Sequence, residues 1–360
     1  MRIFDPMRLR CKICFVLFVL LAVLATPATG SATSCTTQSA LPGVDRDALS
    51  AAGGRLATAA AQQDYATLQA ALLPAVAADW ENMHGIVEQS GSLLKGGEIQ
   101  LRNLYLLDAT SLTAPTDTQF FCSNTSGSIT VTLNLHSLPP GRYALVLAES
   151  KGSPNLGQLS LILAWDGDGP TPGWKLGGIT IHPGSLDGND GVWWWTRARE
   201  LARPDSPKYD PWSAYYSYEM ARALLAPVDF LTSPNLDKLE IEQAQIKIGE
   251  QHEEIGPNKL SKQLSPQNAF PITLPDTART WKIVAVLVDP VLLHADLAVV
   301  YEANPALTDP AAERTEAIAA LSALLKAHPE LRQSFHGLWA YASKEGKRNP
   351  VLEMPMEQIP

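Results

Sequence analysis

The stretch GSITVTLNLH, residues 127–136, decides the fold expected of this 360-residue chain. Every second residue in it is aliphatic: Ile129, Val131, Leu133 and Leu135. The residues between them are small and polar. A period of two sends the two sets to opposite faces of a β-strand. The stretch therefore predicts an antiparallel strand with one buried face and one face towards water.

Four similar runs surround this strand, at 98–107, 142–149, 158–165 and 174–181. The segments 138–141, 152–157 and 166–173 separate the strand at 127–136 and the three runs that follow it. These segments are rich in Gly, Pro, Asp and Asn. Those residues favour tight turns. The whole region predicts a meander of about five antiparallel strands.

Helices are expected before this sheet. Apolar residues recur at helical spacing from Leu49 to Ala60, behind a cap at Asp45 or Asp47. A second helix is expected to open at Asp64, and a third to start at Pro74. Helices followed by an antiparallel sheet predict an α+β fold.

This order of elements, closed by the hairpin GWKLGGITIHP at 173–183, resembles the NTF2-like (cystatin-like) fold over residues 45–184. The resemblance implies a conical pocket between the helices and the curved sheet, where some members carry an acid/base carboxylate or His. The residues expected to face that pocket are Trp80, His84, Tyr105 and Asp108. The whole chain also resembles uncharacterised secreted bacterial proteins in which such a unit precedes a second domain. That kinship implies an architecture and no activity.

Residues 185–250 predict a helical hairpin and a connecting helix. The first helix is DGVWWWTRARELA, 190–202, and the second is PWSAYYSYEMARALLA, 211–226, with Asp210 as cap and Pro211 as first helical residue. Consecutive helical residues point about 100° apart, so the three tryptophans need cover on two sides. They are expected to form an interdomain anchor with aromatic residues of the second helix, namely Trp193, Trp194, Trp195, Trp212, Tyr215 and Tyr216. The alternative is a carbohydrate or peptide surface.

Residues 251–270 are polar and predict a linker, whereas 271–360 predict a second α+β domain in the order ββαββ. Its strands are expected at 281–288, 295–303, 335–342 and 351–356. Its helix, 309–327, is capped by Asp309, with Pro310 at its first position.

The N-terminus has the three-part pattern of a secretory signal, with basic residues, the apolar run ICFVLFVLLAVLA and then small residues. The domain plan is therefore a signal at 1–30, a flexible mature N-terminus at 31–44 and then the units above. Localisation is expected to be periplasmic or extracellular. Cys35 and Cys122 remain after cleavage, and in an oxidising compartment they are expected to form a disulfide. Two free thiols, or a lipid anchor at Cys35, are the alternatives.

The composition argues against several classes of protein. A net charge of −9 with no basic run argues against nucleic acid, and no other apolar run approaches the length of a membrane span. The seven histidines are scattered, with no zinc spacing, so no metal and no cofactor is expected. Ser92 and Lys95 form a loose Ser-x-x-Lys without its accompanying motifs.

Three functional hypotheses remain. The first is a non-catalytic binding or assembly module of the bacterial envelope, with a protein or small molecule as its partner. The second is a small-molecule enzyme, an isomerase or hydrolase, that uses the NTF2-like pocket. The third is glycan binding through exposed Trp and Tyr side chains.

Overall fold

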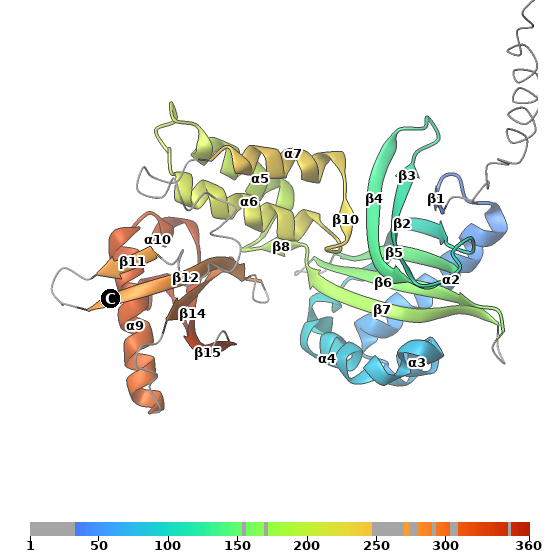
Figure 1. The fold of residues 1–360 in the computed structure, drawn as a ribbon, viewed down its shortest axis with the longest axis horizontal. Coiled ribbons are helices and arrows are strands. Elements are labelled where there is room, and N and C mark those ends of the chain that lie inside the picture. Colours follow the sequence, from blue (N-terminus) through green and yellow to red (C-terminus); the bar gives the residue numbers. More distant parts are fainter. Residues whose placement is uncertain are drawn as a thin grey trace, which may run out of the picture.

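A computed structural model describes residues 33–360 except for 153–155, 169–171, 247–269, 274–278, 290–292, 303–308 and 345–346. The fold is mixed α+β and contains one large and one small sheet with helices packed on both (Figure 1). The α+β prediction is confirmed. The predicted signal, residues 1–30, lies outside the described residues, as does the predicted linker apart from its last residue.

The large sheet has eight strands in the order β10-β4-β3-β1-β2-β5-β6-β7. Their bounds are β1 (Ser34–Thr37), β2 (Glu98–Asp108), β3 (Thr116–Ser123), β4 (Ile129–Leu138), β5 (Arg142–Lys151), β6 (Gly157–Asp166), β7 (Gly173–Pro183) and β10 (Leu231–Thr232). The five strands expected from the sequence are β2, β4, β5, β6 and β7. The expected count was wrong by the remaining three.

Each of the three additional strands lacks a clear alternation of apolar and polar residues, for a physical reason. β1 and β10 have four and two residues, too few for a period of two to register. β3 contains the consecutive aromatic residues Phe120 and Phe121, which break the alternation. β1 also lies between β2 and β3 and pairs in parallel with β3, so the sheet is not a simple antiparallel meander.

Helices cover one face of the large sheet. They are α2 (Gly43–Gln62), α3 (Tyr65–Ala70) and α4 (Trp80–Ser90), with short 3-10 turns η1 (Pro74–Asp79) and η2 (Gly91–Leu94). Helix α2 begins before both expected caps, because the chain already turns at Pro42. Asp64 caps α3, as expected. A Cβ atom at Gly53 would lie 2.8 Å from Cγ1 of Val146, so this glycine allows α2 to approach β5 closely.

The two faces of the large sheet carry different cores, because neighbouring side chains of a strand point to opposite faces. On β2, Leu104 and Leu106 belong to the core beneath α2 to α4, which we call the helix-face core. Tyr105 and Leu107 belong to the core on the other side. We call the latter the disulfide-face core, because Cys122 is part of it.

The middle of the chain forms α5 (Gly191–Ala202), α6 (Pro211–Leu225) and α7 (Pro234–Ala244). The side chains of Asp190, Asp210 and Ser233 each accept a hydrogen bond from the backbone of the first turn. Such caps satisfy N–H groups that have no partner within the helix.

The small sheet has the strand order β11-β12-β13-β14-β15. Its elements are β11 (Phe270–Thr273), β12 (Thr280–Asp289), β13 (Asp296–Glu302), α9 (Pro310–Ala327), α10 (Leu331–Ser334), β14 (Gly337–Lys344) and β15 (Lys347–Pro355), followed by the 3-10 turn η5 (Met356–Gln358). The expected ββαββ elements are present, and β11 is added at the edge. Six of the seven residues of β13 are buried, which indicates cover on both faces.

Helices α5 to α7 share one continuous core with the small sheet, which we call the aromatic core. The sequence predicted that the tryptophans of this hairpin need cover on two sides. Its aromatic residues pack in the core shared with the small sheet, where Tyr216 meets Phe335, the residue after α10, at 6.2 Å between ring centroids. The end of α6 also contacts the large sheet, since Gln158 of β6 donates to the carbonyl of Leu224.

Two segments join the large-sheet unit to this second unit. The hairpin of β8 (Ser185–Leu186) and β9 (Asn189–Asp190) inserts Leu186 into the aromatic core, while Leu293 packs against the helix-face core. Asp187 bonds through its backbone N–H to the carbonyl of Leu293 at 2.7 Å. Strand β10, between α6 and α7, pairs with β4. The two units therefore contact each other through Leu186 and Leu293, and β10 extends the large sheet.

Candidate functional site

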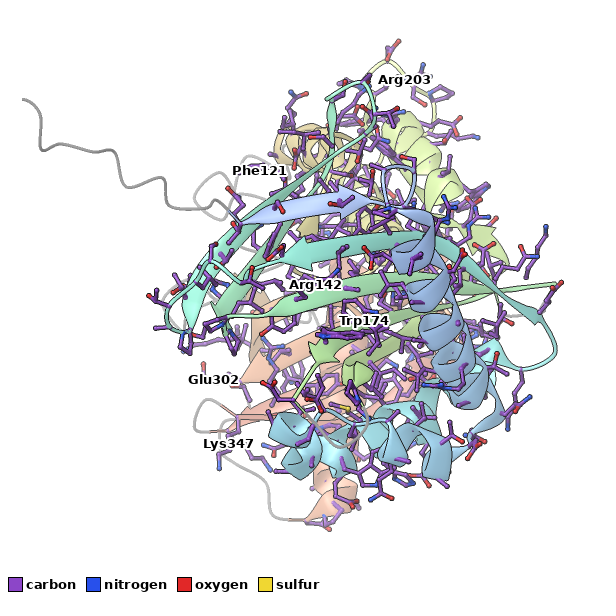
Figure 2. The ribbon with its side chains drawn as sticks, turned by 90° about the vertical axis from the view of Figure 1, so that its right-hand side faces the viewer. Phe121, Arg142, Trp174, Arg203, Glu302 and Lys347 are labelled. Atoms are coloured by element: carbon purple, nitrogen blue, oxygen red, sulfur yellow. A yellow bond between two sulfur atoms is a disulfide. The ribbon has the colours of Figure 1, made fainter. Side chains whose placement is uncertain are left out.

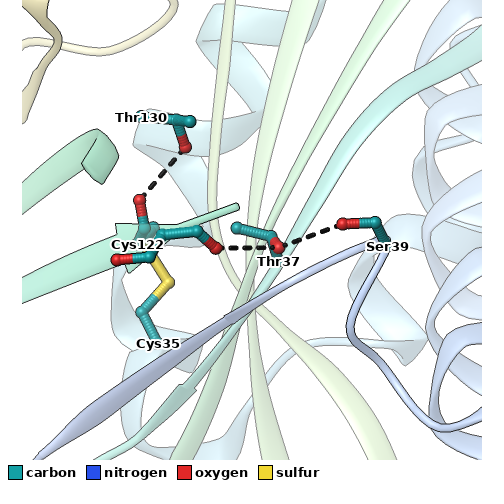
Figure 3. Close-up of a disulfide and its surroundings, with 6 residues drawn as sticks. Cys35, Thr37, Ser39, Cys122 and Thr130 are labelled. Carbon is teal, nitrogen blue, oxygen red and sulfur yellow. Dashed lines mark hydrogen bonds between the residues drawn. A yellow bond between two sulfur atoms is a disulfide. The ribbon is translucent and has the colours of Figure 1, made fainter. Parts of the chain in front are cut away.

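The disulfide Cys35–Cys122 ties the first described strand to the large sheet. Its Cα atoms lie 4.9 Å apart at paired positions of β1 and β3, and the residues are 87 apart in sequence. The predicted disulfide is confirmed. Hydroxyl groups around it bind the backbone: Thr37 donates to the carbonyl of Ser123 at 3.2 Å, and Thr130 to that of Cys122 at 3.1 Å (Figure 3).

A cavity of about 690 Å³ opens beside this disulfide. We call it the disulfide-side cavity. Its lining residues are Thr37, Gln38, Ser39, Arg46, Asn103, Leu104, Tyr105, Asn124 and Thr130. The volume is in the range of small-molecule sites.

The disulfide and a β-bulge position this lining. Gln38 and Ser39 lie three and four residues after Cys35, and Asn124 lies two residues after Cys122, so the covalent bond holds the two walls close together. On β2 the pairing with β5 skips Arg102, which is an extra residue in the strand. Bulges redirect neighbouring side chains, and Asn103 comes immediately after this one.

The lining has an unusual charge for this acidic protein. It contains one guanidinium, that of Arg46, and no carboxylate. The nearest acidic partner of Arg46 is Asp47 at 4.0 Å, and both side chains are exposed, so solvent weakens this pair. Burial raises the pKa of Tyr105, which keeps its phenol neutral and able both to donate and to accept.

The four residues expected to line an NTF2-like pocket do not share one cavity. Trp80 and His84 lie together on α4, with ring centroids 5.7 Å apart, and His84 also meets Tyr65 at 4.4 Å. Tyr105 belongs to the disulfide-face core and lines the disulfide-side cavity, to which Arg46 of α2 and Leu104 also contribute.

Asp108, the last of the four, lies at the end of β2. Its carboxylate accepts from the hydroxyl and the backbone N–H of Thr110 at 2.6 and 2.9 Å. The hydroxyl bond, ahead of the backbone bond, lowers the pKa of Asp108. This is a turn-forming role, away from His84.

Apolar side chains occupy the space where the resemblance places a pocket. Leu56 of α2, Val146 of β5 and Leu161 of β6 have no exposed surface and belong to one helix-face core. At the rim of this face the guanidinium of Arg142 lies 6.0 Å from the ring centroid of Trp174 (Figure 2).

A second cavity of about 250 Å³ adjoins the first through Asn103, which lines both. Its walls include Arg102, Glu149 and Leu224. It lies where α6 approaches the large sheet, and there Gln158 donates to the carbonyl of Leu224 at 2.9 Å. Asn103 therefore lines both of these neighbouring cavities.

The helical layer contains two further cavities. One, of about 570 Å³, is lined by Arg199, Arg203 and Glu242 among others and ends at Ile246, the last described residue before 247–269. Arg199 donates to both carboxylate oxygens of Glu242, at 2.7 and 2.9 Å.

The other, of about 270 Å³, is lined by Glu219 and Arg222 among others. Burial, ahead of the other causes, raises the pKa of Glu219, although the amide of Gln243 donates to its carboxylate and favours the charged form.

The aromatic residues expected to anchor the domains differ in exposure. Trp194, Trp212, Tyr215 and Tyr216 are buried in the aromatic core. Trp195 is half-buried and donates to Glu242 at 2.8 Å. Trp193 keeps 41% of its surface exposed. Their role in holding the two units together stays a prediction.

A cluster of histidines and carboxylates lies where the two units meet. His294 and His336 stack with ring centroids 4.0 Å apart and 16° between their planes. Each Nδ1 lies 3.1 Å from a carboxylate oxygen, that of Asp187 for His294 and that of Asp296 for His336. A metal ion lies in the plane of each imidazole that binds it, and nearly parallel stacked planes do not meet at one ion. Among the described residues no group of three or more potential ligands is arranged to hold a metal.

Most of the residues around the disulfide-side cavity carry no signal in the sequence. Arg46, Asn103 and Asn124 belong to no motif. The predicted disulfide was the available signal, since bonding Cys35 to Cys122 brings the residues that follow each cysteine close together.

Comparison with known proteins identifies no relative. The chain matches no protein-family model and has no significant match among curated proteins or solved structures. In the part of the chain that the structure describes, no helix has the length and apolar character of a membrane span.

Proposed function

We propose that this chain is an exported, non-catalytic binding protein of the bacterial envelope whose ligand occupies the disulfide-side cavity. The observation that carries the proposal is the lining of this cavity, where hydroxyl and amide side chains surround one guanidinium and one phenol. Such groups orient a small polar ligand through hydrogen bonds. The disulfide supports export, since these bonds persist in oxidising compartments.

The proposal includes an NTF2-like origin for the first unit. Helices α2 to α4 cover one face of the large sheet, as that fold requires. The ligand site is proposed at the disulfide-side cavity, where the start of α2 meets the disulfide face of the sheet, because apolar side chains fill the helix-face core. The unit would then keep the architecture of the fold and bind on its other surface.

The composition of the lining favours binding over catalysis. It contains no His, Cys, Asp or Glu, so it holds no general base to activate the hydroxyl of Ser39 or Thr37 as a nucleophile. The enzyme hypothesis relied on Trp80, His84, Tyr105 and Asp108, and these do not converge.

A smaller observation favours glycan binding as a second candidate. Trp193 and its neighbour Val192 are both exposed on α5. One exposed indole is a small platform, so this surface ranks behind the cavity.

The proposal is tested by screening a library of small polar metabolites against the isotope-labelled protein and mapping amide shifts by NMR. We expect at least one compound to shift the amides of residues 37–39 and 103–105 and to lose affinity in Asn103→Ala. The matched control is Asn82→Ala, which removes an exposed amide from α4. If no compound perturbs the cavity, or if Asn82→Ala has the same effect as Asn103→Ala, the proposal is wrong.

A further inference from the structure

The charge of the disulfide-side cavity restricts its ligand further. We infer that the ligand is a hydroxyl-rich monoanion of the sugar-acid class, with its carboxylate at Arg46 and its hydroxyls on the surrounding amide and hydroxyl side chains. This inference rests on the proposed function and adds the chemical class of the ligand.

The first step is the sign of the charge. The chain as a whole has a net charge of −9, yet this cavity has a guanidinium and no carboxylate in its lining. A cationic ligand would find no counter-charge among these residues, whereas an anion would find one. Guanidinium and carboxylate also match in geometry, because two parallel N–H donors meet two oxygens.

The second step is the amount of charge. Arg46 is the single charged residue in the lining, and the next charge described near it, Asp47, is negative. One positive charge balances a carboxylate. A phosphate ester carries nearly two negative charges near neutral pH and would leave part of its charge unpaired beside Asp47.

The third step is the neutral part of the ligand. Thr37, Ser39 and Thr130 offer hydroxyls, and Gln38, Asn103 and Asn124 offer amides. Both kinds of group donate and accept. Sugar hydroxyls do the same, so each is able to find a partner whichever way it points. Thr37 and Thr130 already donate to backbone carbonyls, and Asn124 accepts from backbone N–H groups of its own turn. A purely apolar acid would therefore leave chiefly the amides of Gln38 and Asn103 without a ligand partner.

The fourth step is accessibility. The guanidinium of Arg46 lies at the start of α2 and its side chain is 45% exposed, so a ligand reaches it without displacing a buried ion pair. Asn103 is also exposed and adjoins the second cavity. The site therefore admits a ligand from solvent, and we expect moderate affinity because water screens part of the attraction.

The test is calorimetric titration of the disulfide-bonded full chain with D-glucuronate and D-galacturonate. D-glucose and D-galactose are the neutral partners, differing only at C6, and D-glucose 6-phosphate carries the larger charge. We expect the acids to bind one per chain and at least tenfold more tightly than the neutral sugars and the phosphate. Raising the salt concentration should weaken the binding of the two sugar acids and leave the binding of D-glucose and D-galactose unchanged.

The matched variants are Arg46→Gln and Arg55→Gln, which remove one guanidinium each from helix α2. Arg55 is exposed and lies outside the lining. We expect Arg46→Gln to weaken the acids at least tenfold and to leave the neutral sugars unchanged, Arg46→Lys to restore part of the affinity, and Arg55→Gln to change nothing.

Equal affinity for acid and neutral sugars, tighter binding of the phosphate, or an unchanged affinity in Arg46→Gln would overturn the assignment of the ligand class. If the metabolite library finds another ligand in the cavity while no sugar acid binds, the class is wrong and the proposed function stands. If nothing binds in the cavity, both are wrong.

Discussion

On the disulfide face of the large sheet, six hydroxyl and amide side chains lie around an open cavity. In the aromatic core, by contrast, polar atoms are enclosed by rings: the indole N–H of Trp194 and the hydroxyl of Tyr301 are buried without a hydrogen-bond partner among the described residues. Leaving a buried polar group unpaired costs free energy. The difference teaches that the second unit uses its aromatic residues for packing, whereas polar side chains of the first unit line a cavity, where we propose that a ligand binds.

Breaking the disulfide tests the first half of this comparison and should have the largest effect. The double variant Cys35→Ser, Cys122→Ser opens a loop of 87 residues, and such a closure stabilises a fold by about 4.6 kcal/mol in the chain-entropy model. We expect that loss in the free energy of unfolding, measured by urea denaturation, together with loss of ligand binding. Coincident denaturation curves for the oxidised protein and the variant would contradict the prediction.

Truncating the opposite face separates stability from binding. Leu161→Ala removes a fully buried side chain from the helix-face core, and such substitutions cost about 3 kcal/mol. Because Leu161 does not line the cavity, ligand affinity measured by calorimetry should stay within twofold. A large loss of affinity in a folded variant would place the ligand on the helix face.

The junction between the two units offers a third test. Asp187 accepts from the ring of His294 and from the backbone N–H of Ala295, both at 3.1 Å. Asp187→Ala removes both bonds and should lower the free energy of unfolding by about 2 kcal/mol. It should also broaden the distribution of distances between the units in small-angle X-ray scattering.

Asp187 adopts a left-handed conformation, φ 49°, which Asn tolerates better than Ala. Asp187→Asn is therefore the matched variant, and it should show a smaller loss. Scattering curves identical for the wild-type protein and Asp187→Ala would mean that Asp187 does not hold the two units together.

The smallest expected effect concerns the second unit and depends on pH. Burial raises the pKa of Glu219 in the folded protein, so the folded state holds this proton more tightly than the unfolded state. The free energy of unfolding then falls as pH rises from the ordinary carboxyl range towards the raised pKa. Glu219→Gln removes this loss. Its Tm should equal that of the wild-type protein near pH 4 and exceed it at pH 7; a lower Tm at pH 7 would be the contrary result.

The sequence predicts elements with a clear period and misses those defined by distant partners. The strand containing Val131 and Leu133, the helix capped by Asp309 and the pairing of Cys35 with Cys122 follow from local pattern or compartment. Strand β10 exists because Leu231 pairs with Leu133, nearly a hundred residues away, and no local signal announces it.

The candidate site was harder to foresee than the fold. Its residues come from β1 and the turn after it, α2, β2 and the β3–β4 hairpin, and nearly all are ordinary polar residues in their own segments. The resemblance to the NTF2-like fold also predicted a pocket on the helix side of the sheet. Alternation along β2 puts Tyr105 on the disulfide face of the sheet. Which face the helices α2 to α4 cover is a tertiary feature that the sequence pattern does not give.

Hydrogen exchange of the disulfide-bonded chain, with and without a ligand from the metabolite screen, tests the central claim most directly. We predict slower exchange of amides at 37–39, 103–105 and 124–130 when the ligand is bound, with residues 65–84 of the helix side unchanged. Protection confined to residues 65–84 would contradict the claim that the disulfide face is the binding face.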